Sequence, residues 1–304
     1  MEKSKQPNTE VSSLRCDLHT HSVFSDGTYT PTEIIAEAKR LGLIIALTDH
    51  NTAAGLPEFM AAAQKLGVTA VSGVEFSTEY KGKELHLLGL FVMPEHYAAV
   101  ERMVKEQHVL KEISNMELVE RLNQAGYLID YAKVKGRNPN GNANRAHVAA
   151  ELMEQGYVTS IREAFDTMLS DSGGFYVPPS RLQLTDVIEE LRRIGVIPVL
   201  AHPLQDMTEQ ELRELLPNAV KAGLSGMETM HSSYTDEMIC LAEKIASEYG
   251  LLPSGGSDFH GSVKPDISLG TGTGNLDIPM GVYTDLLREW EKQNYFAKYE
   301  QSTR

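Results

Sequence analysis

The chain has 304 residues, with 28 Lys and Arg against 42 Asp and Glu, and so carries a formal net charge of −14 at pH 7. This acidic balance argues against a broad surface for duplex DNA, which is normally basic. No apolar run approaches the ~18 residues of a membrane span, and residues 1–13 lack the apolar core of a secretory signal. Cys16 and Cys240 form no disulfide framework. We therefore expect a cytoplasmic protein that does not bind membranes.

After a tail expected to be disordered over 1–14, the chain alternates predicted strands and helices. A short strand at 15–18 precedes Thr30-Pro31-Thr32-Glu33, which combines an N-cap, a first-turn Pro and an N3 Glu, and so predicts a helix that ends at Gly42. Strands are predicted at 43–48, 68–74 and 85–91, with a helix at 56–66. Such alternation predicts a mainly parallel sheet, either open or closed into a barrel.

The pattern changes after Pro94, because apolar residues then recur at helical spacing. Helices are predicted at 96–125, 145–155 and 160–169. Alternation resumes with helices at 184–194, 208–222 and 235–249, strands at 196–201, 225–229 and 251–255, and a last helix at 283–295. We therefore expect an α/β barrel-like domain from 15–95 and 178–304, interrupted by a mostly helical insertion domain over 96–177.

Histidines and carboxylates cluster where the predicted strands end. His19 and His21 follow the first strand at a spacing that turns both side chains to one side, Asp49 and His50 follow the second, and Glu75 closes the third. The carboxyl ends of parallel strands meet at one rim of a sheet or barrel, where sites are built. Chain-distant ligands are thus expected to converge there.

Nine residues are candidate metal ligands, which is too many for one ion and fits two or three. They are His19, His21, Asp26, His50, Glu75, His86, His202, Asp258 and His260. Imidazole with carboxylate suits Zn, Mn or Fe, and ions ~3.5–4 Å apart suit in-line displacement at phosphorus. A single histidine of this kind is more often structural, and His96 and His108, within the helical stretch, are expected to be ordinary helix residues.

The insertion carries one further cluster, Asn144-Arg145-Ala146-His147. An arginine can hold a phosphate with two hydrogen bonds, and a nearby histidine can add another or a proton. The alternative is an ordinary surface pair at the start of a helix.

Together these residues resemble the PHP (polymerase and histidinol phosphatase) superfamily of metal-dependent phosphoesterases. The resemblance is carried by DLHTHSVFSDG at 17–27, TDHN at 48–51, GVEFS at 73–77, ELHLLG at 84–89, AHP at 201–203 and GSDFHG at 256–261. It implies a distorted (β/α)7 barrel and three divalent ions. The implied ligand sets are His19, His21, Glu75 and Asp258; then Glu75, His86 and His202; and finally Asp26, His50 and His260. Asp26 stands where some members have His, which favours Mn²⁺ beside Zn²⁺ or Fe²⁺.

Within the superfamily, the NRAHVA segment resembles the branch of nucleoside 3′,5′-bisphosphate phosphatases and 5′-to-3′ exoribonucleases, with Ala146 where that branch usually has Pro. The resemblance implies that Arg145 and His147 grip substrate phosphate. Glu228 and His231 stand where members place pocket residues, so that Glu228 is expected to bind substrate and His231 to act in catalysis with Glu75 and Asp258. Asp49 is expected to orient a ligand histidine.

The expected reaction is hydrolysis of a phosphate ester by a metal-activated hydroxide. The expected substrate is small, either a nucleoside 3′,5′-bisphosphate or the 5′ end of a short RNA, because a helical insertion over the rim would limit access. Alternatives are a phosphatase of histidinol phosphate or another small metabolite, a non-catalytic PHP module, and a hydrolase of C–N bonds with a similar site. The oligomeric state is left open.

Overall fold

The computed structural model describes residues 14–137, 143–170 and 173–302. The tail expected over 1–14 therefore lies outside the described residues, except for Leu14. None of the helices in the described ranges combines the length and the apolar character needed to cross a bilayer.

Seven strands form a nearly closed barrel. They follow the order β1 (Arg15–Asp17), β2 (Leu43–Leu47), β3 (Ala70–Tyr80), β4 (Lys83–Leu90), β6 (Ile197–Leu200), β7 (Gly226–His231) and β8 (Leu252–Gly256), while β5 (Leu182–Gln183) pairs with β3. The backbone N–H of Leu18 donates to the carbonyl of Gly255 at 3.1 Å and so brings β1 next to β8. The distorted α/β barrel predicted from the sequence is confirmed.

The direction of β4 departs from the predicted alternation. β4 pairs antiparallel with both β3 and β6, whereas the other neighbours in the barrel are parallel. Lys81 and Gly82, the two residues between β3 and β4, both have positive φ, at 52° and 80°. Two such residues make the tight hairpin turn that matches strand twist. Because β3 continues to Tyr80, Glu75 lies in the middle of that strand, and the prediction that it closes the strand was wrong.

Several helices pack on the outer face of the strands. They are α1 (Pro31–Leu41), α2 (Leu56–Leu66), α7 (Leu184–Arg193), α8 (Pro203–Asp206), α9 (Glu209–Ala222) and α10 (Asp236–Glu248), whereas α11 (Met280–Ser302) packs with residues of the opposite strand face. The predicted start of α1 is confirmed, because the Thr30 side chain accepts from the Glu33 N–H and Glu33 caps back. Strand residues alternate between two cores: Ile45 packs with the outer helices and Ile44 with α11, as the two-residue period of a strand requires.

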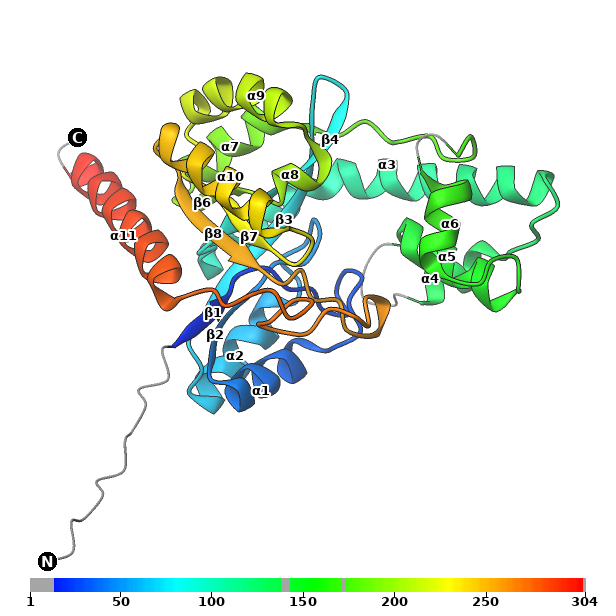
Figure 1. Cartoon of the computed structure of the whole chain (residues 1–304), viewed down its shortest axis with the longest axis horizontal. Coiled ribbons are helices and arrows are strands. Elements are labelled where there is room, and N and C mark those ends of the chain that lie inside the picture. The colour runs from blue at the N-terminus through cyan, green and yellow to red at the C-terminus, as the bar shows by residue number, and fades with distance from the viewer. Residues whose placement is uncertain (1–13, 138–142, 171–172, 303–304) are drawn as a thin grey trace, which may run out of the picture.

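The long helix α3 (Tyr97–Gln124) leads away from the barrel to a group of shorter helices, α4 (Tyr131–Gly136), α5 (Arg145–Glu154) and α6 (Ile161–Ala164), gathered at its far end (Figure 1). Near its start, Val100 and Val104 belong to the barrel core. Near its end, Leu118 and Leu122 belong to a separate apolar cluster shared with α5 and α6. The exact boundaries of an insertion at 96 and 177 stay a prediction.

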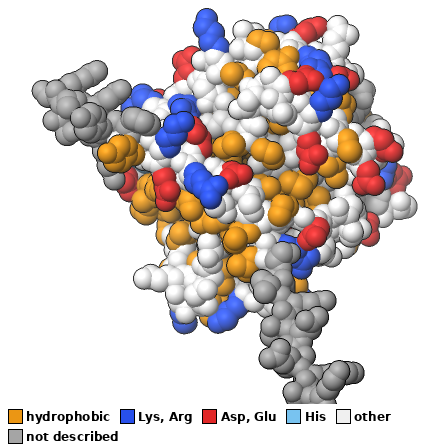
Figure 2. Space-filling model, turned by 60° about the vertical axis from the view of Figure 1, so that its left-hand side comes forward, with side chains coloured by type: hydrophobic (Ala, Val, Ile, Leu, Met, Phe, Trp, Pro, Cys, Tyr) orange, Lys and Arg blue, Asp and Glu red, His pale blue; other side chains and the backbone are white. Residues whose placement is uncertain are grey.

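One side of the molecule is shown as a space-filling view (Figure 2). Acidic and basic side chains are interspersed on it, around an area where apolar side chains gather. On this face, the described residues do not form a continuous basic surface.

Candidate metal centre

The first two histidines of the centre are fixed by the close approach of β1 and β8. His19 and His21 are fully buried, and their Nε2 atoms lie 3.1 Å apart. A Cβ atom on Gly256 would come within 2.3 Å of the Cβ of His19. Glycine at this position therefore allows the end of β8 to pass directly against His19.

Glu75 lies at the middle of the histidines. Its Oε2 is 3.2 Å from Nε2 of His19, 3.2 Å from Nε2 of His21 and 3.0 Å from Nδ1 of His50. Its Oε1 is 2.8 Å from Nδ1 of His86 and 3.2 Å from Nε2 of His202. The two oxygens of this one buried carboxylate thus face two different groups of histidines.

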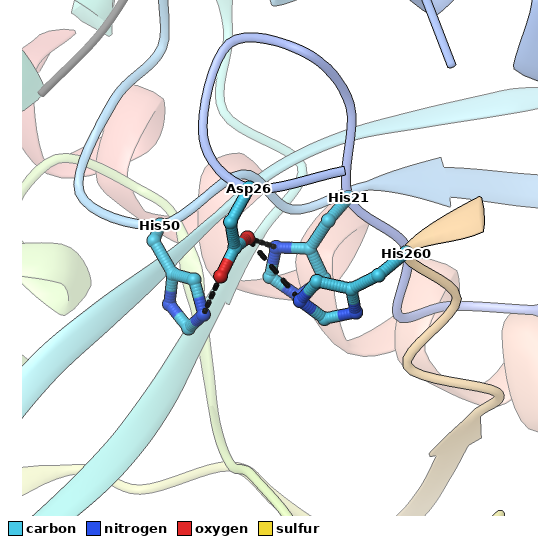
Figure 3. A group of neighbouring side chains, drawn as sticks. All are labelled: His21, Asp26, His50 and His260. Carbon is cyan, nitrogen blue, oxygen red and sulfur yellow. Dashed lines mark ion pairs between the residues drawn. The ribbon is translucent and has the colours of Figure 1, made fainter. Parts of the chain in front are cut away.

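A second group gathers around Asp26 (Figure 3). Oδ1 of Asp26 lies 3.2 Å from Nε2 of His260 and 3.6 Å from Nδ1 of His21, and Oδ2 lies 3.7 Å from Nε2 of His50. The rings of His21 and His260 stack with their centroids 4.1 Å apart. His21 and His50 therefore border both the Asp26 group and the Glu75 group.

Asp258 completes the arrangement from the segment after β8. Its Oδ1 is 3.3 Å from Nε2 of His21 and 3.6 Å from Nε2 of His19. Its Oδ2 is 2.5 Å from Nζ of Lys264, and this carboxylate raises the pKa of Lys264 although burial opposes the rise. One oxygen of Asp258 thus faces Lys264, and the other faces His19 and His21.

Three residues at the rim have a left-handed backbone. The φ angles of Asn51, His202 and Asp258 are 51°, 28° and 56°. Side chains other than glycine adopt this region at a cost, and such strain is concentrated at functional sites. Two of the three are candidate ligands, and the third directly follows His50.

The donor set fits divalent ions. Several buried donor and acceptor atoms lie close to oppositely charged atoms but make no well-aligned hydrogen bond within the described part of the chain, among them Asp26 Oδ1, His50 Nδ1, Glu75 Oε2, His86 Nδ1 and His202 Nδ1. Two atoms that bind one ion at ~2.1 Å lie about 3.0–3.4 Å apart, close to most of the separations found here. Groups with compatible ligand atoms in the described residues are His21, Asp26, His50 and His260; His19, His21 and Glu75; His50, Glu75 and His86; and His19, Glu228 and His231.

The ring charges in this cluster are set by burial and by neighbouring carboxylates. Burial lowers the pKa of His50 to about 3. Burial acts in the same sense on His86, but Glu75 and Glu84 together outweigh it and raise the pKa of that ring to about 10. A cluster of buried titratable side chains that shift the pKa values of one another is typical of metal and catalytic centres.

Two aspartates of the sequence motifs hold the backbone. Asp17 accepts from the N–H and the hydroxyl of Ser257, at 2.8 and 2.6 Å, and from the N–H of Gly270. Asp49 accepts from the N–H and hydroxyl of Ser22 and from the hydroxyl of Ser25. Asp49 thus orders the turn that leads to Asp26. Because the Ser25 hydroxyl also lies 3.4 Å from Nδ1 of His21, Asp49 reaches a candidate ligand histidine through Ser25, in keeping with the orienting role expected from the sequence.

Glu228 lies within β7 and His231 at its end, and both side chains contact the histidine cluster. Glu228 is fully buried and accepts from Nδ1 of His19 at 3.0 Å and from the backbone N–H of His202 at 2.7 Å. Nδ1 of His231 accepts from the N–H of Ser233 at 3.2 Å, which leaves the proton on Nε2. That Nε2 lies 3.7 Å from Oδ2 of Asp258.

A cavity of about 160 Å³ opens beside the candidate ligands Asp26, His50 and His86, and three cations line it: Lys111, Arg145 and Arg181. Arg145 lies over the Tyr176 ring, 4.1 Å from its centroid. Glu84 accepts from Arg181 at 2.5 Å and from Arg145 at 3.4 Å.

Lys111 and Arg181 are additions to the residues singled out from the sequence, as is His108, which also lines the cavity. His108, Lys111 and Asn115 recur at three- and four-residue spacing on α3, so that they share one face of the helix. This polar face of the predicted helix was the feature of the sequence that could have indicated these residues as part of the site. Arg181 follows an irregular stretch and has no such pattern around it.

His147 is held at the start of α5. Its Nδ1 accepts from the backbone N–H of Asn144 at 3.1 Å, and the Asn144 side chain accepts from the His147 N–H in return. Burial lowers the pKa of His147 to about 4. The ring is therefore neutral near pH 7, and since Nδ1 is an acceptor, its proton sits on Nε2.

Comparison with known proteins agrees with this geometry. The family model for the PHP domain matches residues 17–177, which is more than half of the chain. A 5′-3′ exoribonuclease of Haemophilus influenzae is 33% identical over 246 residues, covering 80% of this chain and 89% of that protein. A 3′,5′-nucleoside bisphosphate phosphatase of Chromobacterium violaceum is 34% identical over 255 residues, covering 80% and 86%.

Among solved structures, a metal-dependent phosphoesterase of Bifidobacterium adolescentis superposes with a TM-score of 0.80 at 27% identity, covering 93% of this chain and 96% of that one. The barrel with its histidine and carboxylate rim is that of a metal-dependent phosphoesterase, an enzyme that hydrolyses phosphate esters. The chain belongs to the PHP family.

Proposed function

We propose that this enzyme hydrolyses nucleotides that carry a second phosphate, either nucleoside 3′,5′-bisphosphates or the 5′ end of short RNA. The observation that carries this proposal is the cation-lined cavity directly beside the candidate metal ligands. While one phosphate lies at the metal centre, the cavity lined by Lys111, Arg145 and Arg181 can receive another phosphate of the same substrate, since arginine forms paired hydrogen bonds with phosphate. These three cations outnumber Glu84, with which Arg145 and Arg181 pair, and a substrate with a single phosphate would not use that positive charge.

We assign three divalent ions to the centre, with Mn²⁺ favoured over Zn²⁺ or Fe²⁺ because Asp26 adds a hard oxygen ligand to the third site. The proposed ligand sets are His19, His21, Glu75 and Asp258; Glu75, His86 and His202; and Asp26, His50 and His260. The two faces of Glu75 support a bridging role, because its oxygens meet different histidines. Bound ions of this kind supply Lewis acidity and activate the attacking water.

The protein's own groups would position the substrate and move its protons. Arg145 and Arg181 would bind the non-reacting phosphate, and the neutral His147 would donate a hydrogen bond from Nε2 to the same phosphate. His231 would hold a proton at Nε2, close to Asp258, where it can pass to the leaving oxygen of the ester. Glu228 is more suited to orienting His19 than to touching substrate, because it is fully buried and already bonded.

Phosphate release from adenosine 3′,5′-bisphosphate (pAp) by Mn²⁺-loaded protein tests the proposal, with AMP and histidinol phosphate as comparison substrates. We expect kcat/KM for pAp to exceed that for either monophosphate by at least tenfold, since a charged hydrogen bond contributes about 1.5–3 kcal/mol. Preference for histidinol phosphate would instead make the enzyme a small-metabolite phosphatase. Equal rates on all three would remove the role of the cationic cavity.

A further inference from the structure

A second cavity borders the metal centre. Its volume is about 260 Å³, and it shares His50, Asn51, His108, Lys111 and Asn144 with the cation-lined cavity. Two of the shared residues are joined by a hydrogen bond, in which Nε2 of His108 donates to the backbone carbonyl of Asn51 at 2.6 Å. The candidate ligand His50 thus lines both cavities, next to this contact from α3.

The two cavities differ in charge. Apart from the candidate ligand Asp26, the first has three cations and one carboxylate, Glu84. The second has Lys111 and one carboxylate, Glu101, and this carboxylate is engaged by the N–H of Ala53 at 2.7 Å and the hydroxyl of Thr52 at 3.0 Å. Lys111 and Glu101 balance the charge of the second cavity, so this cavity attracts an anion much less than the first cavity does.

The second cavity also has an apolar side, formed by Phe24 and Ala54. Phe24 packs closely on the chain at Gly55, where an added Cβ would lie 3.1 Å from its ring. A partly exposed aromatic ring in a space of balanced charge suits the flat face of a nucleobase, because bases stack on aromatic side chains whatever their sequence.

A phosphodiester has two substituents that diverge from phosphorus, and two cavities diverge from this metal centre. We propose that the second cavity binds the nucleoside beyond the scissile phosphate of a single-stranded substrate, stacked on Phe24, while the first binds the terminal 5′-phosphate. This inference rests on the proposed function and extends it. The enzyme then takes 5′-phosphorylated dinucleotides and longer strands as well as mononucleotide bisphosphates, which use the first cavity alone.

The reaction is the same for both kinds of substrate. The oxygen of water bonds to phosphorus, the bond from phosphorus to the 3′ oxygen of the first nucleotide breaks, and that oxygen leaves with a proton. The phosphate stays on the 5′ oxygen of the second nucleoside. The 5′-phosphorylated dinucleotide pApA plus water therefore gives two molecules of AMP, whereas pAp plus water gives AMP and inorganic phosphate.

The test compares kcat/KM for pApA with kcat/KM for pAp in Mn²⁺-loaded wild-type protein and in variants. Phe24→Leu removes the ring, and Ala54→Phe fills the same cavity from its other apolar residue. We expect each to lower the pApA to pAp ratio about tenfold, the effect of losing one stacked base. Phe165→Leu is the matched control, because Phe165 lines the first cavity and its loss should leave the ratio at the wild-type value.

Bound metal is measured in each variant, because Phe24 lies two residues before Asp26. If Phe24→Leu loses metal, the pApA to pAp ratio of Ala54→Phe alone decides whether the second cavity binds the nucleoside. Wild-type hydrolysis of pAp without hydrolysis of pApA would overturn the second cavity while leaving the proposed function intact, and so would an unchanged ratio in Ala54→Phe. Failure on both substrates would remove the proposed function and this inference with it.

Discussion

His19 turns its Nδ1 towards Glu228, whose Oε1 lies 3.0 Å away, and neither side chain is accessible to solvent. An Nδ1–H that donates to this carboxylate leaves the lone pair of the ring on Nε2. That atom faces Glu75 and Asp258. A carboxylate behind a histidine in this way fixes the tautomer and orientation of a metal ligand.

Glu228→Gln should therefore weaken metal binding by about 10- to 100-fold, the usual effect of losing such a partner. The KM for pAp, measured at saturating metal, should change little, because Glu228 contacts His19 and the backbone of His202 rather than the cavity. Metal titration followed by calorimetry gives the affinity. Glu151→Gln is the matched control, since Glu151 is equally buried but pairs with Arg137. A selective rise in KM would assign Glu228 to substrate instead.

The residue pattern predicted the barrel, the capped start of α1 and the convergence of chain-distant ligands, because each depends on local signals. Strand ends meet at a rim whatever connects them, so His19, His50 and His202 could be expected together. The direction of β4 could not be predicted in this way. Lys81 and Gly82 form a hairpin turn, where strand–helix alternation implied a crossover to a parallel strand.

Residues on the long helix were harder to place. Whether His108 faces solvent or the centre depends on how α3 packs on the barrel, which the periodicity of a single helix does not specify. His108 was accordingly expected to be an ordinary helix residue, whereas it bonds to the carbonyl beside His50. Arg181 reaches the cavity through its ion pair with Glu84, a contact between residues 97 positions apart.

Arg181→Gln should raise the KM for pAp about tenfold or more and leave kcat within a few-fold, because a charged hydrogen bond to the distant phosphate contributes about 1.5–3 kcal/mol to binding. The side chain of Arg181 is 7% exposed, so little of this contribution is lost to solvent screening. Steady-state kinetics of phosphate release provide the measurement. Arg193→Gln serves as the control, because Arg193 forms an exposed pair with Glu190. An unaltered KM would exclude Arg181 from phosphate recognition.

Glu75→Gln should abolish tight binding of at least one ion and lower kcat by orders of magnitude. The amide keeps the size of the side chain but removes the negative charge that faces five histidines. Metal analysis after gel filtration gives the number of ions retained, and kcat follows from phosphate release. Glu79→Gln, on the same strand, should match wild type in both. Wild-type metal content in Glu75→Gln would refute the bridging role.

His147 gives the protein a pH-dependent stability whose sign is fixed by burial. Its pKa is about 4 in the folded chain, against an ordinary value of 6.5. Between these values the unfolded chain binds a proton that the folded chain does not, so the free energy of unfolding falls as the pH is lowered through this window. His147→Gln removes the titrating ring, while a Gln at the third helical position can still accept from the Asn144 N–H.

We therefore expect wild-type protein to lose more stability than His147→Gln as the pH is lowered from 7 to 5. Urea unfolding of both proteins in EDTA at several pH values measures the difference, and the comparison cancels the titration of the metal-centre histidines that both share. Above the ordinary pKa of histidine, the two proteins should show the same dependence of the free energy of unfolding on pH, because His147 is then unprotonated in both the folded and the unfolded chain. Parallel pH profiles would mean that His147 is as solvated in the folded chain as in the unfolded one, and would remove the basis for a neutral Nε2 donor at the phosphate.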